Sequence, residues 1–367
     1  MDNLAHTLLG LTLAKAGLER STPLATTALI ISSNLPDVDA LARLDGGTPA
    51  YLEYHRGFTH GFVGVAILAA ALTAVLTLLD RRFRLRSDPF RRPILPSRIF
   101  LLSCLGGLGH AFLDFTNVYG VRPFEPFSGH WLYGDVVYVV DPWIWLILGS
   151  AALWQTTRGP LRKLAWGIVG LMLSYIVAFA LRRPSTSQPS VPDASRIIWF
   201  IALGVIIVIA VFRAGRSTAT SARAALFVLA LFYAGAWTAH RTAVNQVLSA
   251  LPVEGVTQLS AWPVPADPTI WQTAIKAGSS LFYGKVNLRT KRTEWQQIQS
   301  LEPDIETALR RSPDARIFLD FARYLDASVE ERSGGYSVRL RDLRFSLHLN
   351  AELDRDLNVQ SAEVAWY

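Results

Sequence analysis

The feature that most constrains this chain is an apolar run from Gly61 to Leu79, which contains no charged residue. A run of this length is sufficient to cross the hydrocarbon core of a bilayer as an α-helix. It directly follows the segment His55–His60, which holds two imidazoles and the guanidinium of Arg56. Ionisable side chains at the mouth of a membrane span are costly unless they have a partner or a function. The sequence therefore predicts a membrane helix with a polar site at one end.

Further apolar runs predict a polytopic membrane protein. Only 18% of the 367 residues are charged, whereas soluble domains carry about 25%. We expect a mainly α fold, a membrane helix bundle of about eight segments of which the first two are short. The expected segments are residues 4–18, 23–33, 61–79, 99–115, 143–154, 164–181, 197–212 and 224–239.

The distribution of arginines predicts the orientation of these segments. The loop 80–98 is rich in arginine, and the positive-inside rule places it in the cytoplasm. Both termini are then expected outside, although Arg182 and Arg183 fall on the outer side against the rule. The net charge of +7 reflects this topology, and no nucleic-acid partner is predicted.

Residues 250–367 differ in kind from the rest of the chain, because they are more charged and contain no apolar run of spanning length. We predict two domains, a membrane bundle over residues 1–245 and a small α+β domain over 250–367 outside the membrane. The helical stretches expected in the second domain are 302–311 and 314–326, and the alternating, strand-like stretches are 335–349 and 358–367.

Histidines and carboxylates fall at the predicted outer ends of several segments, which brings potential ligands to one depth of a helix bundle. His110 and Asp114 are four residues apart and share one face of a helix. Asp37 and Asp39 would point the same way from an extended backbone. The metal ligands expected on this basis are His6, Asp37, Asp39, His55, His60, His110 and Asp114.

This donor set suits one or two divalent ions. The single cysteine, Cys104, excludes a cysteine-rich site. Zinc suits the mixture of nitrogen and oxygen donors best, and manganese or iron would also fit. Two ions about 3.5–4 Å apart can clamp a phosphoryl displacement and lower the pKa of a bound water. Asp39 or Asp114 would then act as the base, and Arg56 would bind a phosphate oxygen.

Other polar residues are candidates to orient these ligands from outside. They are Asn3, Asn34, Asn117, Asp135, Asp141 and His240. Simpler explanations stay open: Asp141 before Pro142 suits the start of a helix, and His130 and His240 suit hydrogen-bonded positions at the interface. A buried hydrogen-bonded couple is the alternative for His110 and Asp114, which we interpret as metal ligands.

Taken together, these motifs resemble the YdjM-like family of bacterial membrane-bound metal-dependent hydrolases. The motifs are Asn3-x-x-His6, Leu35-Pro36-Asp37-x-Asp39, His55-Arg-Gly-x-Thr-His60 and His110-x-x-x-Asp114-x-x-Asn117. Gly134-Asp135 and Asp141-Pro142-Trp143 are similar to its YfhP-like branch. The order of the His and Asp residues is also, more faintly, similar to zinc-dependent phospholipase C, without the His-x-x-x-Glu pattern of its three-zinc site.

The resemblance implies a multi-pass protein of the bacterial inner membrane that carries out metal-dependent hydrolysis. We expect a lipid or phosphoester substrate, reached from the outer leaflet of the bilayer. Two alternatives stay open. Intramembrane His and Asp also mark the ion paths of transporters, and a bound ion could simply staple helices in a structural membrane protein.

Overall fold

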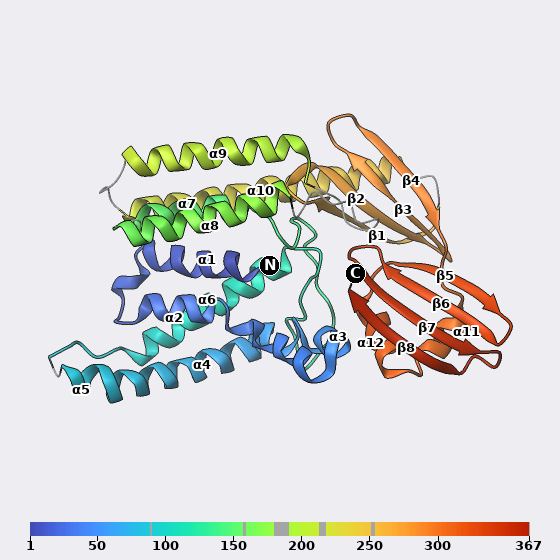
Figure 1. The fold of residues 1–367 in the computed structure, drawn as a ribbon, viewed down its shortest axis with the longest axis horizontal. Helices are drawn as coiled ribbons and strands as arrows, with labels where there is room; N and C mark the ends of the chain where they lie inside the picture. Colours follow the sequence, from blue (N-terminus) through green and yellow to red (C-terminus); the bar gives the residue numbers. More distant parts are fainter. Residues whose placement is uncertain (89, 157–158, 180–190, 213–217, 251–253, 367) are drawn as a thin grey trace.

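The computed structural model describes the chain except for residues 89, 157–158, 180–190, 213–217, 251–253 and 367. Helices form the first part of the chain, and two antiparallel sheets form most of the last part (Figure 1). The main helices of the bundle are α1 (Asn3–Lys15), α2 (Ala25–Ser32), α4 (Phe62–Leu79), α6 (Pro96–Phe115), α7 (Pro142–Thr156), α8 (Pro160–Ala178), α9 (Asp193–Phe212) and α10 (Thr218–Ser249). Further helical segments connect them: η1 (Leu18–Arg20), η2 (Leu35–Ala42), α3 (Arg43–Tyr54), η3 (Phe58–His60), η4 (Asp80–Arg84) and α5 (Leu85–Ser87).

The prediction of eight membrane segments is not supported. Within the described residues, four helices are long and apolar enough to cross a membrane: Phe62–Arg84, Pro96–Phe115, Pro160–Ala178 and Ala219–Ser249. The first two predicted segments correspond to α1 and α2, whose 13 and 8 residues extend only about 20 and 12 Å, against a hydrocarbon core of about 30 Å. The apolar helix Pro142–Leu153 is also shorter than a span. Arg182 and Arg183 lie outside the described residues.

Close packing of small residues joins the helices that carry the polar site. A Cβ atom on Gly106 of α6 would lie 2.0 Å from the Ser32 hydroxyl oxygen on α2. A Cβ atom on Gly64 of α4 would lie 1.9 Å from the carbonyl oxygen of Phe58 in η3. Only glycine permits such approaches, as is common where membrane helices meet. These two positions therefore bring α2 against α6 and η3 against the first turn of α4.

The C-terminal region contains two four-stranded antiparallel sheets, each with its strands in chain order. The first sheet comprises β1 (Val256–Val264), β2 (Asp267–Ala277), β3 (Ser280–Asn287) and β4 (Arg292–Ile298). The second comprises β5 (Leu325–Arg332), β6 (Gly335–Asp342), β7 (Leu347–Asp354) and β8 (Val359–Trp366). Two helices, α11 (Pro303–Leu309) and α12 (Pro313–Phe321), connect the sheets.

The predicted elements of this region are correct in type but not in extent. Two helices and a last strand occur close to their predicted positions. The single strand predicted over 335–349 is wrong, because β6 ends at Asp342 and a turn leads into β7. The predicted helix 314–326 ends at Phe321, and β5 starts at Leu325.

Both sheets lie at the end of the bundle where α1 begins and α6 ends (Figure 1). Helix α10 links the two parts, since its last turns pack Ala243 and Val247 against Ala261, Trp271 and Ile275 of the first sheet. The boundary predicted near residues 245–250 thus falls at the end of one continuous helix.

Candidate metal centre

The predicted ligands come from five segments that meet at the end of the bundle near the sheets. These are α1 with His6, η2 with Asp37 and Asp39, the residue after α3, which is His55, η3 with His60, and the last turns of α6 with His110 and Asp114. The expectation that Asp37 and Asp39 point the same way is wrong. They lie in a 3-10 helix, which has three residues per turn, so residues two apart point about 120° away from each other.

Four of the predicted ligands converge on one point. The Nε2 atoms of His60 and His110 lie 3.0 Å apart. Oδ2 of Asp114 lies 3.2 Å from each of them, and Oδ1 of Asp37 lies 3.5 Å from each. The side chains of His60, His110 and Asp114 are fully buried, and that of Asp37 is 14% exposed. These four residues therefore form a compact group of nitrogen and oxygen atoms that could hold a metal ion.

The tautomers of the two imidazoles follow from their outer hydrogen bonds. Nδ1 of His110 lies 2.8 Å from the backbone carbonyl oxygen of Ser33, which can only accept, so Nδ1 carries the proton. Nδ1 of His60 lies 3.1 Å from Oδ2 of Asp39, which is also an acceptor. In neutral rings the Nε2 atoms are then unprotonated. Two lone pairs and two carboxylates face one another, and a cation is what such an arrangement needs.

The spacing of these atoms fits a zinc ion. Zinc bonds of about 2.0–2.2 Å in a tetrahedron separate neighbouring ligand atoms by about 3.3–3.6 Å. The separations between the two imidazoles, and between each imidazole and each carboxylate, run from 3.0 to 3.5 Å, which is within this range or up to about 0.3 Å below it. Two imidazoles and two carboxylates also match the donor types that zinc accepts. Asp37, His60, His110 and Asp114 thus pass the test of fit for one divalent ion.

Asp39 lies behind this group and accepts hydrogen bonds from four donors. Its Oδ1 lies 2.8 Å from Nδ1 of His55. Its Oδ2 accepts from Thr59 Oγ1 at 2.6 Å and from the backbone N–H of Arg56 at 3.1 Å, and it lies 3.1 Å from Nδ1 of His60. A carboxylate offers about four lone-pair sites. Asp39 is therefore saturated by its neighbours, and it orients the two imidazoles.

His55 belongs to a second group of potential ligands, with Asp39 and His60. Its ring stacks on Tyr51 with the centroids 4.5 Å apart. Burial lowers the pKa of His55 to about 4, against the hydrogen bond and charge of Asp39, which raise it. His55 is therefore neutral at physiological pH and donates its Nδ1–H to Asp39.

His6 lies beside the four-residue group and outside it. Its ring stacks on His110 at a centroid distance of 3.7 Å. Its Nε2 lies 3.5 Å from Oδ1 of Asp114, and neither ring nitrogen makes a hydrogen bond within the described structure. The same carboxylate oxygen contacts the amino group of Met1. The fully buried His6 therefore keeps a free nitrogen next to Asp114.

Arg56 is buried and its guanidinium is engaged by the protein. Its Nη2 lies 3.1 Å from Oδ1 of Asp114, and its Nη1 donates to Oδ1 of Asn117 at 2.9 Å. The guanidinium carbon lies 4.4 Å from the ring centroid of Tyr119. Arg56 has a φ of 62°, which is uncommon for a residue with a side chain. These contacts direct Arg56 toward Asp114 and away from solvent.

The other predicted residues divide into two sets. Asn3 donates to Oδ2 of Asp37 at 3.0 Å, and Asn117 holds Arg56, so both contact the site. The remaining ones make contacts elsewhere: Asn34 bonds to Thr7 and Ile30, Asp135 to Arg323, Asp141 to the backbone of Trp143, and His240 lies against Trp271. For Asp141 the simpler explanation, the start of a helix, describes the observed contact.

Sequence reasoning gave no role to three groups at the site: the Thr59 hydroxyl, the Ser33 carbonyl and the Tyr119 ring. Thr59 stands within the quoted motif, so its position carried a signal. A backbone carbonyl carries none in any sequence, and Tyr119 reaches Arg56 only through the fold.

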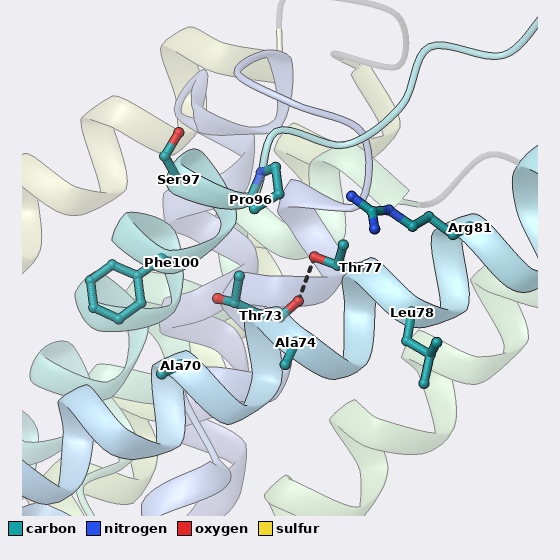
Figure 2. Close-up of a pocket in the computed structure, with 9 residues that line it drawn as sticks. All are labelled: Ala70, Thr73, Ala74, Thr77, Leu78, Arg81, Pro96, Ser97 and Phe100. Atoms are coloured by element: carbon teal, nitrogen blue, oxygen red, sulfur yellow. Dashed lines mark hydrogen bonds between the residues drawn. The ribbon is translucent and has the colours of Figure 1, made fainter.

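A groove elsewhere on the bundle is separate from this site. It lies between α4 and α6, has a volume of about 580 Å³, and is lined by small, hydroxyl and apolar side chains with Arg81 at one end (Figure 2). The Thr77 hydroxyl bonds to the Thr73 carbonyl within its wall. Its lining contains no histidine and no carboxylate, so it lacks the side chains that commonly bind a metal ion.

Part of this chain is similar to known proteins. The uncharacterized protein YfhP of Bacillus subtilis (strain 168) is 27% identical over 169 residues, which are 44% of this chain and 48% of that protein. The chain thus aligns with about half the length of this curated relative. No solved structure matches it. The family model described as YdjM inner membrane protein matches residues 1–185, which include all the candidate ligands. This match confirms the resemblance seen in the motifs, and the chain belongs to the YdjM family of inner membrane proteins.

Proposed function

We propose that this protein is a metal-dependent hydrolase of the inner membrane. One observation carries the proposal: two unprotonated imidazole nitrogens, from His60 and His110, converge with the carboxylates of Asp37 and Asp114. The ion is divalent, with zinc preferred and manganese or iron as alternatives. When bound, such an ion supplies Lewis-acid polarisation and lowers the pKa of a coordinated water.

We further propose a single ion. A second ion in the group of Asp39, His55 and His60 would have to displace the protons that His55 and His60 present to Asp39. It would also compete with the hydrogen bonds from Thr59 and from the Arg56 backbone. Asp39 is therefore proposed to hold the two rings in place, as carboxylates behind metal-binding histidines commonly do.

The side chains around the proposed ion have different proposed roles. Arg56 balances and orients Asp114 from within the protein, so we assign it to positioning in place of phosphate binding. Asp37 is the only one of the four ligand residues with an exposed side-chain edge, so it is best placed to accept a proton from a substrate or a water. Asn3 holds the second oxygen of this carboxylate.

A lipid or lipid-linked phosphate ester is the proposed substrate class. Apolar side chains beside Asp37 on η2 and α3 are exposed: Val38 by 43%, Leu41 by 60% and Leu44 by 85%. In a 3-10 helix, residues three apart lie above one another, so Val38 and Leu41 form one apolar edge. Such an edge suits contact with lipid at the membrane surface. We propose that the site and the region 250–367 face the outer side, as the positive-inside rule predicts.

A second candidate function has specific support. Structural zinc sites commonly have four protein ligands, whereas catalytic sites keep one position open. The four residues Asp37, His60, His110 and Asp114 could fill all four positions and staple η2, η3 and α6. A hydrolase would then require that the Asp37 carboxylate leaves its coordination position, so that a water molecule can occupy it.

Metal analysis and turnover on detergent-purified protein distinguish these functions. We expect one zinc per chain in the wild type and none in a His60→Ala, His110→Ala double variant. The wild type is then assayed with p-nitrophenyl phosphate and with phospholipid vesicles. Zinc-dependent release of phosphate supports the hydrolase. Tight zinc without turnover of any ester favours the structural ion, and a folded wild type without metal overturns the site.

A further inference from the structure

The region beyond the family match contacts the metal centre through Tyr119. Arg56 covers one side of this ring at 4.4 Å from its centroid. The rings of Phe321 and Phe345 lie 4.9 and 5.7 Å from it. Tyr119 is buried. The ring thus connects the guanidinium that holds Asp114 with two aromatic residues of the C-terminal region.

Arg344 holds the backbone next to this ring. Its Nη1 donates to the carbonyl oxygen of Val118 at 3.3 Å. Its Nη2 donates to the carbonyl of Phe321 at 2.8 Å and to Asp342 at 2.7 Å. Arg344 and Asp342 are both fully buried. Val118 stands between Asn117 and Tyr119, which both contact the Arg56 guanidinium.

Burying this ion pair requires an explanation beyond stability. The cost of desolvating two charges commonly cancels most of their attraction, so an apolar pair would serve a sheet as well. Arg344, however, also donates outside the C-terminal region, to the Val118 carbonyl on the loop that follows α6. This is a directional contact that an apolar residue cannot make.

A second contact joins the C-terminal region to the loop after α6. Nη1 of Arg323 donates to Oδ2 of Asp135 at 2.8 Å. The residues on either side of Asp135 bond back to the end of α6, because Gly134 N–H donates to the Phe115 carbonyl and Val136 N–H to the Thr116 carbonyl. The C-terminal region therefore bonds to the loop after α6 at two residues, Val118 and Asp135.

We infer that Arg344 is a positioning residue of the metal centre, which fixes Asn117 and Tyr119 and through them holds Arg56 against Asp114. The inference rests on the proposed metal site. Arg344 lies outside residues 1–185, which the family model matches. The C-terminal region thereby completes a site whose ligands all belong to the matched part.

The test measures zinc affinity of the full chain by competition with a chromophoric chelator. Residues that orient ligands from outside commonly change metal affinity by about 10–100-fold. We expect Arg344→Met to bind zinc about 10-fold more weakly than the wild type. The matched control is Arg341→Gln on the neighbouring strand position, where a half-exposed pair with Asp326 is lost, and its affinity should equal that of the wild type.

Tyr119 variants test the same connection where Arg344→Met fails to fold. The Tyr119 hydroxyl makes no hydrogen bond within the described residues, so an effect of Tyr119 on the site must come from its ring. Tyr119→Leu removes the ring below Arg56 and should weaken zinc binding about as much as Arg344→Met. The double variant should lose less than the sum of the two, because both act through Arg56.

The outcomes separate this inference from the proposed function. A wild type that binds one zinc, with folded Arg344→Met and Tyr119→Leu variants of unchanged affinity, overturns the inference and leaves the site intact. A folded wild type that binds no zinc overturns both.

Discussion

The Nε2 atoms of His60 and His110 lie 3.0 Å apart with no proton between them in their neutral tautomers. Each ring is held from behind, His60 by Asp39 and His110 by the carbonyl of Ser33. Two carboxylate oxygens, from Asp37 and Asp114, close the group. Arg56 and the Met1 amino group contact Oδ1 of Asp114, and a cation at the centre of the group would stabilise the acceptors that face one another there. This relationship supports a metal centre more directly than the count of histidines does.

The first prediction concerns the repulsion within the metal-free site. Asp37→Asn removes one negative charge and introduces an amide donor next to the two Nε2 atoms. We expect zinc affinity to fall at least about 10-fold. We also expect the chelator-treated variant to unfold at a higher temperature than chelator-treated wild type, because the repulsion is relieved. Thermal unfolding with and without chelator measures both effects, and a metal-free variant less stable than metal-free wild type would contradict the account.

The second prediction assigns Asp39 to orientation. Asp39→Asn replaces one of the two acceptor oxygens by an NH2 group. His55 and His60 bond to different oxygens of Asp39, so one of the two imidazole N–H groups would then face a donor. Zinc affinity should fall about 10–100-fold while the ion count stays at one per chain. Thr59→Val removes a single donor to Asp39 and should have a smaller effect in the same direction. An Asp39→Asn variant that lost one of two bound ions would instead show that Asp39 is a ligand.

The third prediction concerns pH and Asp141, which caps α7 away from the metal centre. Burial raises the pKa of Asp141 to about 7, against the opposing hydrogen bonds of Trp143 and Ile144. The folded state therefore holds a proton that the unfolded state loses near pH 4, and this group's contribution to stability declines as the pH rises from about 4 to 7. Asp141→Asn keeps an N-cap acceptor and removes this decline.

Chemical unfolding at pH 5 and at pH 8 measures the effect. Asp141→Asn should be more stable than the wild type at pH 8, by on the order of 2–4 kcal/mol, with a smaller difference at pH 5. Equal stability of the two proteins at pH 8 would show that Asp141 is ionised in the fold at no cost.

The fourth prediction uses the contact between η3 and α4. In Gly64→Ala the new Cβ atom would lie 1.9 Å from the Phe58 carbonyl oxygen, so η3 and His60 must move. We expect a loss of stability of about 1–3 kcal/mol and weaker zinc binding. Gly167→Ala is the matched control on α8, where a Cβ atom meets open space. Its unfolding temperature and zinc affinity should match those of the wild type.

The fifth prediction concerns orientation. In a Cys104→Ser background, Ser87→Cys tests the arginine-rich loop and Ser333→Cys tests the turn between β5 and β6. The positive-inside rule places the first in the cytoplasm and the second outside. A membrane-impermeant maleimide should label Ser333→Cys in spheroplasts and label Ser87→Cys only after lysis. The reverse labelling pattern would invert the proposed orientation.

Local sequence determined much of this protein. The uncharged run 61–79 is long enough for a span by itself, and it lies in a membrane-length helix. The four-residue spacing of His110 and Asp114 is a local property of a helix, and both side chains reach the same point. The Asp pair and the His55–His60 motif were expected at one depth because each falls at the predicted outer end of a segment. These inferences depended on residues close together in the chain.

Tertiary contacts decided the rest. Eight spans are not supported by the described residues. Hydropathy does not distinguish a helix packed inside the bundle from one that crosses the membrane, and α1 and α2 are too short to cross. The separation of Asp37 from Asp39 depended on a 3-10 turn in place of an extended strand. The Ser33 carbonyl determines which nitrogen of His110 is free to bind an ion. Tyr119 packs against the Arg56 guanidinium, and Arg344 bonds to the loop after α6 that carries Tyr119. Roles of this kind depend on hydrogen-bond partners far away in the chain, and only the folded structure brings those partners together.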